Sequence, residues 1–128
     1  MRLLGIDYGS KKIGLALSNS EGDFAAPHSV IPAGKSAVDV IKKLITAQEV
    51  SEIVIGRSLN FKREENEIMK EITPFAELLG TETGLPVYFI DETLTSAAAR
   101  RTQEADAMLD ARAAALLLES FIAKRKRG

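Results

Sequence analysis

The sequence has no cysteine and only one histidine, His28. Without cysteine, the chain cannot form a disulfide-stabilised scaffold or a zinc site built on thiolates. A single histidine also excludes a histidine-rich metal cluster, so any metal ion bound by this chain has to be held by oxygen atoms. His28 itself is expected to be inert in catalysis.

The sequence also lacks a long apolar run and an excess of charge of one sign. Nothing approaches the roughly 18 apolar residues of a membrane-spanning helix, and Asp7 interrupts the first apolar run before a signal peptide could form. We therefore expect a cytoplasmic protein. The net charge of -1 gives no support to a generally basic nucleic-acid binder, and the stretch KRKR at 124–127 is expected to be a solvated end.

The rest of the composition is ordinary for a globular protein. The 128 residues are 45% hydrophobic and 27% charged. A domain of this size buries roughly two-thirds of its unfolded surface, which is enough for a core without cross-links. We expect one domain over residues 1–128.

Apolar spacing predicts the secondary structure. The first segments read as a hairpin of strands over 2–6 and 12–18, and a third strand over 26–32 suits a sheet edge because Pro27 and Pro32 lack an N–H donor. The later segments predict a helix over 36–48, a strand over 52–56, a helix over 63–80, a strand over 85–90, a helix over 97–107, and a final helix with the apolar stripe Ala111, Ala114, Ala115, Leu118 and Ile122.

Details of the second helix and of the sheet follow from the same pattern. Pro74 is expected to kink or break the helix, and Gly80 and Gly84 to close it. The order of elements predicts an α/β fold in which a mixed five-stranded sheet carries helices on both faces. The later strands show no polar alternation, so we expect them to be central and covered on both sides.

Three carboxylates lie where predicted elements begin or end: Asp7, Glu92 and Asp110. In an α/β sheet such positions gather at one rim, where ligands usually bind. Carboxylates brought together repel one another unless cations balance them, and Mg²⁺ is the natural partner of oxygen ligands. Two such ions can support hydrolysis of a phosphodiester.

Each of these acids also has a purely structural interpretation. Asp7 could be a residue that starts a turn, and Asp110, taken alone, is better explained as a helix N-cap. Asp91 and Glu92 are consecutive on a strand and therefore point to opposite faces. Spacing alone does not say which of the two faces a metal.

Four motifs in the right order resemble the YqgF/RuvX family of the ribonuclease H-like superfamily. They are GIDYGSKKIGLALS at the start, IGRSLN at 55–60, DETLTS after the fifth strand, and LDARAAALLLESF in the last helix. Family members are described as Holliday-junction resolvases and as nucleases that mature the 5′ end of pre-16S rRNA. The resemblance implies a ribonuclease H-like fold and a metal-dependent endonuclease, with pre-16S rRNA as the favoured substrate and four-way DNA junctions as the alternative.

The resemblance also assigns residues and a cofactor. Asp7, Glu92 and Asp110 would be the catalytic, metal-binding carboxylates for two Mg²⁺ or Mn²⁺ ions, with Asp91 and Asn60 in supporting roles. The partner would be structured or single-stranded RNA, or branched DNA, and not a membrane; the sequence does not choose between a monomer and a homodimer. Candidate contacts to nucleic acid are Gly9, Lys11, Lys12, Arg57, Arg100 and Arg101.

Two positions depart from the family pattern. Ser58 stands where the family usually has proline, and Thr93 where it usually has the arginine that would contact phosphate. Tyr8 and Phe61 could stack on a base, although packing against the sheet is the stronger expectation for both.

Two further hypotheses come from other classes of protein. GIDYG also resembles the phosphate-binding hairpin of actin-like sugar kinases and ATPases, but those proteins close two domains over the nucleotide and this chain supplies one. A non-catalytic ribonuclease H-like module that binds a partner or nucleic acid is the other alternative. Retention of all three acids argues against it, because folding alone does not require carboxylates that repel one another.

Overall fold

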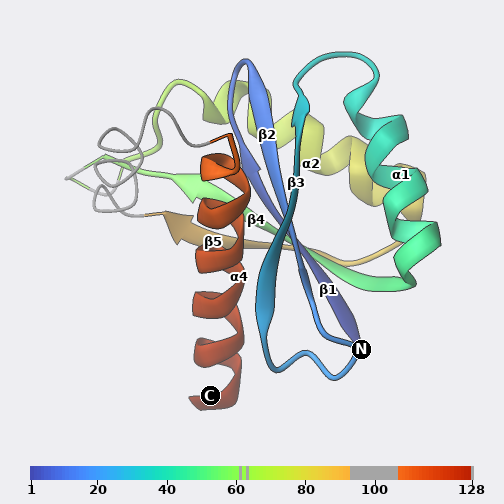
Figure 1. Cartoon of the computed structure of the whole chain (residues 1–128). Coiled ribbons are helices and arrows are strands. Elements are labelled where there is room, and N and C mark those ends of the chain that lie inside the picture. The colour runs from blue at the N-terminus through green and yellow to red at the C-terminus, as the bar shows by residue number, and fades with distance from the viewer. Residues whose placement is uncertain (61, 63, 93–106, 128) are drawn as a thin grey trace.

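A five-stranded sheet forms the centre of the molecule (Figure 1). The computed structural model describes residues 1–60, 62, 64–92 and 107–127, with the backbone alone for Glu92 and Arg127. The strands are β1 (Arg2–Tyr8), β2 (Lys12–Ser18), β3 (Ala25–Pro32), β4 (Val50–Ser58) and β5 (Val87–Glu92). The helices are α1 (Ala37–Gln48), α2 (Met69–Thr83) and α4 (Leu109–Arg127).

The sheet is mixed and has the strand order β3-β2-β1-β4-β5. β1 pairs antiparallel with β2 and parallel with β4; β2 pairs antiparallel with β3, and β4 pairs parallel with β5. The prediction of a mixed five-stranded sheet is confirmed. The prediction that 26–32 forms an edge strand is confirmed as well, and Pro27 and Pro32 lie on it where a missing donor costs little.

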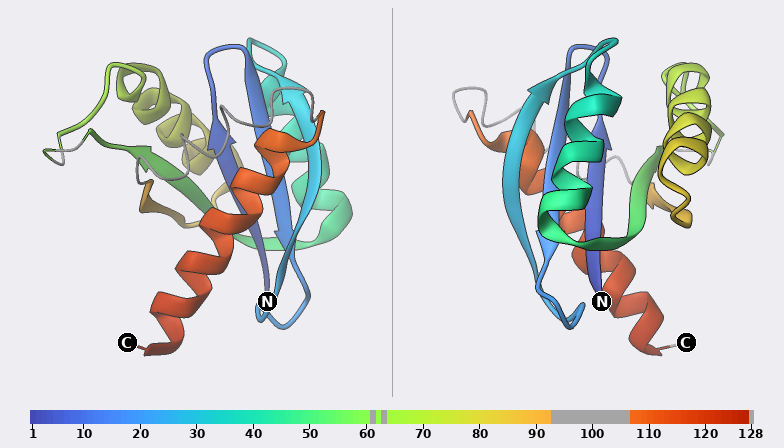
Figure 2. Two further views of the ribbon diagram at one scale, coloured as in Figure 1. Left: turned by 60° about the vertical axis from the view of Figure 1, so that its left-hand side comes forward. Right: turned by 90° about the vertical axis from the view of Figure 1, so that its right-hand side faces the viewer.

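Helices cover both faces of the sheet, as predicted (Figure 2). Leu4 and Ile6 of β1 pack in the cluster with α1 and α2, whereas Leu3 packs in the cluster with α4. Because both faces are covered, β1 is buried from Leu3 through Asp7 and shows no polar alternation. The final helix buries the predicted stripe of Ala111, Ala114, Ala115, Leu118 and Ile122.

The expectation that the later strands are central is right for β4 and wrong for β5. Strand β5 is at the end of the sheet, where it pairs only with β4 in the described part of the chain. It spans Val87–Glu92 instead of 85–90, and Tyr88 and Phe89 are 38% and 42% exposed. The apolar run therefore predicted that a strand forms here, but it did not predict that the strand lies at the edge of the sheet.

Helix α2 begins at Met69, six residues later than predicted. The preceding segment is held to the end of β4 instead, because Leu59 bridges Glu65 and the Asn66 side chain donates to Ser58 Oγ at 2.8 Å. The helix then runs through both Pro74 and Gly80 without a break and ends at Gly84, whose φ is 71°. The expected closure at Gly84 is confirmed, and that at Gly80 is wrong.

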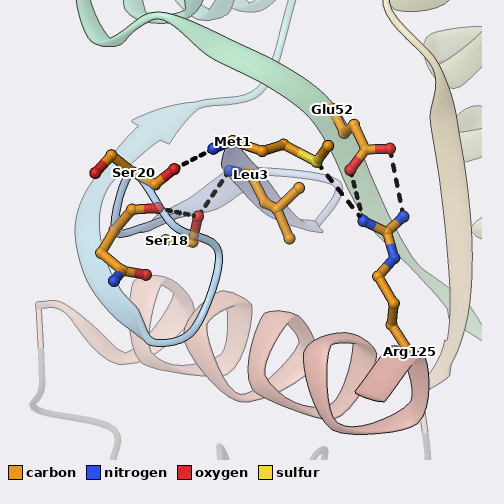
Figure 3. Close-up of polar contacts among 7 residues, drawn as sticks. Met1, Leu3, Ser18, Ser20, Glu52 and Arg125 are labelled. Atoms are coloured by element: carbon orange, nitrogen blue, oxygen red, sulfur yellow. Dashed lines mark hydrogen bonds and ion pairs between the residues drawn. The ribbon is translucent and has the colours of Figure 1, made fainter. Parts of the chain in front are cut away.

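The basic end of α4 is more than a solvated tail. Arg125 forms an ion pair with Glu52 of β4, with Nη1–Oε1 and Nη2–Oε2 distances of 2.7 and 3.3 Å, and it also contacts the Met1 sulfur (Figure 3). Glu52 is only 9% exposed. Arg125 thus ties the C-terminal part of α4 to the sheet and to the first residue of the chain (Figure 3).

The helix predicted over 97–107 lies almost wholly outside the described residues. Within the described residues, no helix is both long enough and apolar enough to cross a lipid bilayer.

The packing of α4 gives a stability prediction. Leu118 is fully buried in the α4 cluster, whereas Leu116 of the same helix is 56% exposed. We expect Leu118→Ala to lower the free energy of unfolding by about 2–5 kcal/mol, because it removes buried atoms and leaves a cavity. Leu116→Ala is the matched control and should change it by less than about 0.5 kcal/mol. Urea unfolding followed by circular dichroism measures both; equal losses would contradict the observed orientation of α4.

Candidate functional site

Asp7 is a buried carboxylate near the carboxyl end of β1. Its side chain is 2% exposed, and its ladder partner on β2 is Gly14. Leu3 packs against α4, and successive strand residues alternate between faces, so Asp7 points to the α4 face of the sheet. A carboxylate buried this deeply is costly unless hydrogen-bond donors or cations stabilise its charge.

The first turn of α4 rests directly on β2 beside Asp7. A Cβ atom added to Gly14 would lie 1.9 Å from the carbonyl oxygen of Asp110. Further along the same helix, a Cβ on Gly5 would lie 2.9 Å from the carbonyl oxygen of Ala114. Glycine at both strand positions lets the helix backbone approach the sheet backbone. The structure thereby brings Asp110 next to the ladder partner of Asp7.

Asp110 occupies the first turn of α4 and is not its N-cap. The helix begins at Leu109, so Asp110 is the second helical residue. The Arg112 N–H donates to the Met108 carbonyl across this first turn. The N-cap interpretation favoured for Asp110 alone is therefore wrong in position. A carboxylate in the first turn is still stabilised by the positive end of the helix dipole.

The register of β5 separates Asp91 from Glu92. Asp91 is the ladder partner of Arg57 on β4. Its Oδ1 accepts a hydrogen bond from Arg57 Nε at 2.9 Å and forms an ion pair with Nη2 at 2.8 Å. Arg57 is two residues beyond Ile55, which packs in the cluster with α1 and α2. The Asp91–Arg57 pair therefore belongs to the face away from α4. The backbone of Glu92 is the last of β5 and lies opposite Ser58.

The turn between β1 and β2 is tight at Gly9. The Gly9 N–H donates to the Lys12 carbonyl at 2.9 Å, and a Cβ on Gly9 would lie 2.7 Å from that oxygen. The Lys11 carbonyl accepts from Ala33 N–H at 2.9 Å. These bonds fix the turn and leave the side chains of Lys11 and Lys12 exposed to solvent. A contact from this turn to nucleic acid stays a prediction.

The other candidate residues on the chain have structural partners or lie outside the described part. Asn60 Oδ1 accepts from the N–H groups of Lys62 and Glu64, at 2.9 and 3.0 Å, so this side chain shapes the loop after β4. Arg57 is engaged by Asp91 and, at 4.0 Å, by Glu65. Arg100, Arg101, Thr93 and Phe61 lie outside the described residues.

Tyr8 packs against helix α2, which confirms the stronger of its two expectations. Its ring centroid lies 4.9 Å from that of Phe75. Burial raises the pKa of the Tyr8 hydroxyl, and the charge and hydrogen bond of Glu71 raise it further. The neighbour of Asp7 thus fastens the end of β1 to α2 on the opposite face. His28 is exposed on β3 and contacts Ser29 Oγ at 2.9 Å through Nδ1.

The residue types at this rim suit a hard divalent cation. Asp7 and Asp110 supply carboxylates on facing elements, since the Asp110 backbone lies on Gly14, the ladder partner of Asp7, and the chain offers no thiolate. Among the side chains that the structure describes, no group of three histidine or acidic residues could hold a metal ion. The described side chains include those of Asp7 and Asp110 but not that of Glu92, so only two of the three predicted acids are among them.

Sequence reasoning missed Gly14 as a residue of the site. The sequence does contain a signal for it, because Gly14 stands inside an apolar strand, and such a glycine commonly marks the close approach of another backbone. Gly14 holds no ligand, but its missing side chain decides how near α4 comes to Asp7.

Comparison with known proteins agrees with this architecture. The family RuvX, described as Holliday junction resolvase, matches residues 1–124. A protein of Maridesulfovibrio salexigens named "Putative pre-16S rRNA nuclease" is 31% identical over 97% of this chain and 99% of its own length. A protein of the same name from Dictyoglomus thermophilum is 35% identical over 99% of this chain and 83% of its own length. Thermus thermophilus RuvC, solved with a Holliday junction substrate, superposes with a TM-score of 0.64 at 16% identity, covering 98% of this chain and 96% of that one.

The fold is that of the ribonuclease H-like class, with an acid on the central strand facing the last helix. Within that class, the chain belongs to the RuvX family.

The contact at Gly14 yields a second prediction. We expect Gly14→Ala to destabilise the protein by about 1–3 kcal/mol, because the new methyl group collides with the backbone of α4. Gly80→Ala in α2 is the control: its Cβ would meet Val87 at an ordinary 3.6 Å, and alanine favours a helix by up to about 1 kcal/mol. Thermal unfolding compares the two. A neutral Gly14→Ala would mean that α4 does not touch β2 as described.

Proposed function

We propose that this protein is a metal-dependent endonuclease that hydrolyses phosphodiester bonds during 5′-end processing of pre-16S rRNA. The observation that carries the proposal is the buried Asp7 carboxylate, facing α4 where Asp110 enters that helix. Membership of the RuvX family and relatives that span nearly the whole chain and are named for pre-16S rRNA support the substrate. Processing of ribosomal RNA fits a cytoplasmic protein.

In this proposal Asp7, Glu92 and Asp110 would hold two Mg²⁺ or Mn²⁺ ions. When bound, such ions would activate a water and stabilise the leaving oxygen. The protein contributes a rigid position for Asp7, because this residue is hydrogen-bonded into the central strand and covered by α4. The first turn of α4 fixes the position of Asp110 in the same way.

Glu92 is the better candidate of the adjacent pair on β5. It lies two residues beyond Ile90, and the Ile90 side chain packs in the α4 cluster. Strand alternation therefore supports placing Glu92 on the face of Asp7. Asp91 has a supporting role in this scheme, since its ion pair with Arg57 joins the ends of β4 and β5.

Asp7→Asn tests the metal assignment. We expect the rate of cleavage of a pre-16S rRNA leader in Mg²⁺ to fall at least about 100-fold, because ligand charge is lost where the metal contributes several kcal/mol. Asp39→Asn is the control; Asp39 is exposed in the first turn of α1 on the other face of the sheet. Cleavage that survives in Asp7→Asn, or that persists in a chelator, would refute the proposal.

Glu92 and Asp91 can be compared directly. We expect Glu92→Gln to abolish cleavage, whereas Asp91→Asn should lower stability and leave most of the activity, because Asp91 faces Arg57. Single-turnover cleavage of the same RNA, with circular dichroism as the folding check, gives both readouts. The opposite ranking would assign the metal site to Asp91.

A second candidate substrate is a four-way DNA junction, favoured by the description of the RuvX family. Symmetric resolution requires two active sites at a matched spacing, hence a dimer. Cleavage of an rRNA leader and of a junction should be compared at equal Mg²⁺ and salt, because backbone affinity depends steeply on salt. Junction cleavage by a dimer, with the leader left intact, would favour this alternative.

A further inference from the structure

A pocket of about 580 Å³ lies between strand β5 and the end of helix α4. Its lining consists of Phe89, Ile90, Asp91, Phe121, Lys124 and Arg125. We call it the β5–α4 pocket. Its volume falls within the roughly 300–1,000 Å³ that proteins use for bound molecules. It results from the edge position of β5, which the sequence did not predict.

Aromatic rings and a guanidinium lie at or beside this pocket. Phe89, which alternates to the other face of β5 from Ile90, lines the pocket at the open edge of the strand and is 42% exposed. The Phe121 ring lies 5.5 Å from that of Tyr88. The Arg125 guanidinium carbon lies 4.7 Å from the Phe121 centroid and 5.5 Å from that of Tyr88. Because Arg125 lies over the Phe121 and Tyr88 rings, Phe89 provides the exposed aromatic face of the lining. Exposed aromatic faces stack on unpaired bases.

The charge at the pocket is suited to a phosphate backbone. Glu52 forms an ion pair with Arg125 (Figure 3). Arg57 forms one with Asp91. Lys124 is exposed, and in the described part of the chain it makes no ion pair. An ammonium group next to stacking faces is a typical arrangement in proteins that bind single strands.

The pocket is continuous with the candidate site along the chain. Asp91 lines the pocket, and the next residue is Glu92, at the end of β5. A strand of nucleic acid that leaves the rim at Glu92 and follows β5 would therefore reach Phe89 and Lys124.

We propose that the β5–α4 pocket binds a single-stranded segment of the RNA substrate outside the cleavage site, with a base on the aromatic faces and a phosphate at Lys124. This inference rests on the proposed function for the identity of the substrate. A protein strand added to the edge of β5 is the competing occupant. It gives no reason for the exposed ammonium group of Lys124, and the test below separates the two.

The experiment uses the full chain carrying Asp7→Asn, so that bound RNA stays intact. A fluorescein-labelled 12-nucleotide uridine-rich RNA is titrated by anisotropy. We expect Phe89→Ala to weaken binding at least about fivefold, the lower limit for loss of one stacked base. Lys124→Ala should weaken it and reduce the slope of log affinity against log salt by about 0.7, the value for one phosphate contact on a single strand.

Matched controls lie on α1 and α2, outside the lining of the pocket. Leu78→Ala removes an apolar side chain of α2 that is 48% exposed, and Lys43→Ala removes an exposed charge of α1. Both should bind RNA like the parent. In addition, RNA containing 4-thiouridine should crosslink on irradiation to peptides that include Phe89 or Phe121.

The outcomes separate this inference from the proposed function. If both pocket variants bind within twofold of the parent, or crosslinks map elsewhere, the pocket is not an RNA site, whatever the wild type cleaves. If crosslinks map to the pocket but the wild type cleaves no RNA, the pocket stands and the proposed function fails. If Phe89→Ala abolishes a dimer seen by sedimentation and leaves RNA binding unchanged, the pocket is a protein interface and the inference is overturned.

Discussion

The site depends on a contact between two backbones. The first turn of α4 lies on Gly14, and the next turn lies on Gly5, so that helix and sheet approach more closely than ordinary side chains allow. Gly14 is also the ladder partner of Asp7. One absent side chain therefore sets the separation between the acid on the central strand and the acid on the last helix. A cation site needs that separation fixed, because hard divalent ions bind oxygen within narrow distance limits.

Strand alternation then distributes the remaining charges. On β1 it turns Asp7 toward α4 and Tyr8 toward α2, where Tyr8 packs on Phe75. On β5 it gives Asp91 to the face of Arg57, where an ion pair closes the end of the sheet. On β1, neighbouring residues thus divide into one that faces α4 and one that packs on α2.

Much of the fold could be predicted from the sequence, because apolar spacing records which faces are buried. The hairpin, the edge position of β3 and the buried stripe of α4 all follow from local patterns. The edge position of β5 could not be predicted, since its run of apolar residues resembles that of the central β4. The start of α2 was missed because Asn66 and Glu65 bind back to β4, a tertiary choice that helical spacing does not record.

For the candidate site, motifs name the acids Asp7, Glu92 and Asp110, and their role stays a prediction. The geometry around Asp7 and Asp110 could not be predicted, because the strand glycine between them carries no chemistry of its own. Arg125 was taken for part of a solvated tail, because a basic run shows nothing of the buried Glu52 that it meets across the sheet. Pairings between residues far apart in the chain become visible only in the folded structure.

The way α4 is attached has a consequence for the protein's motions. The strands are joined by ladder hydrogen bonds, whereas α4 is held by apolar packing on the sheet and by the Arg125–Glu52 pair. Undocking of α4 alone would carry Asp110 away and leave Asp7 in place, and partial openings require less free energy than global unfolding. The fraction of molecules in which both acids lie on facing elements would then be set by the docking equilibrium of one helix.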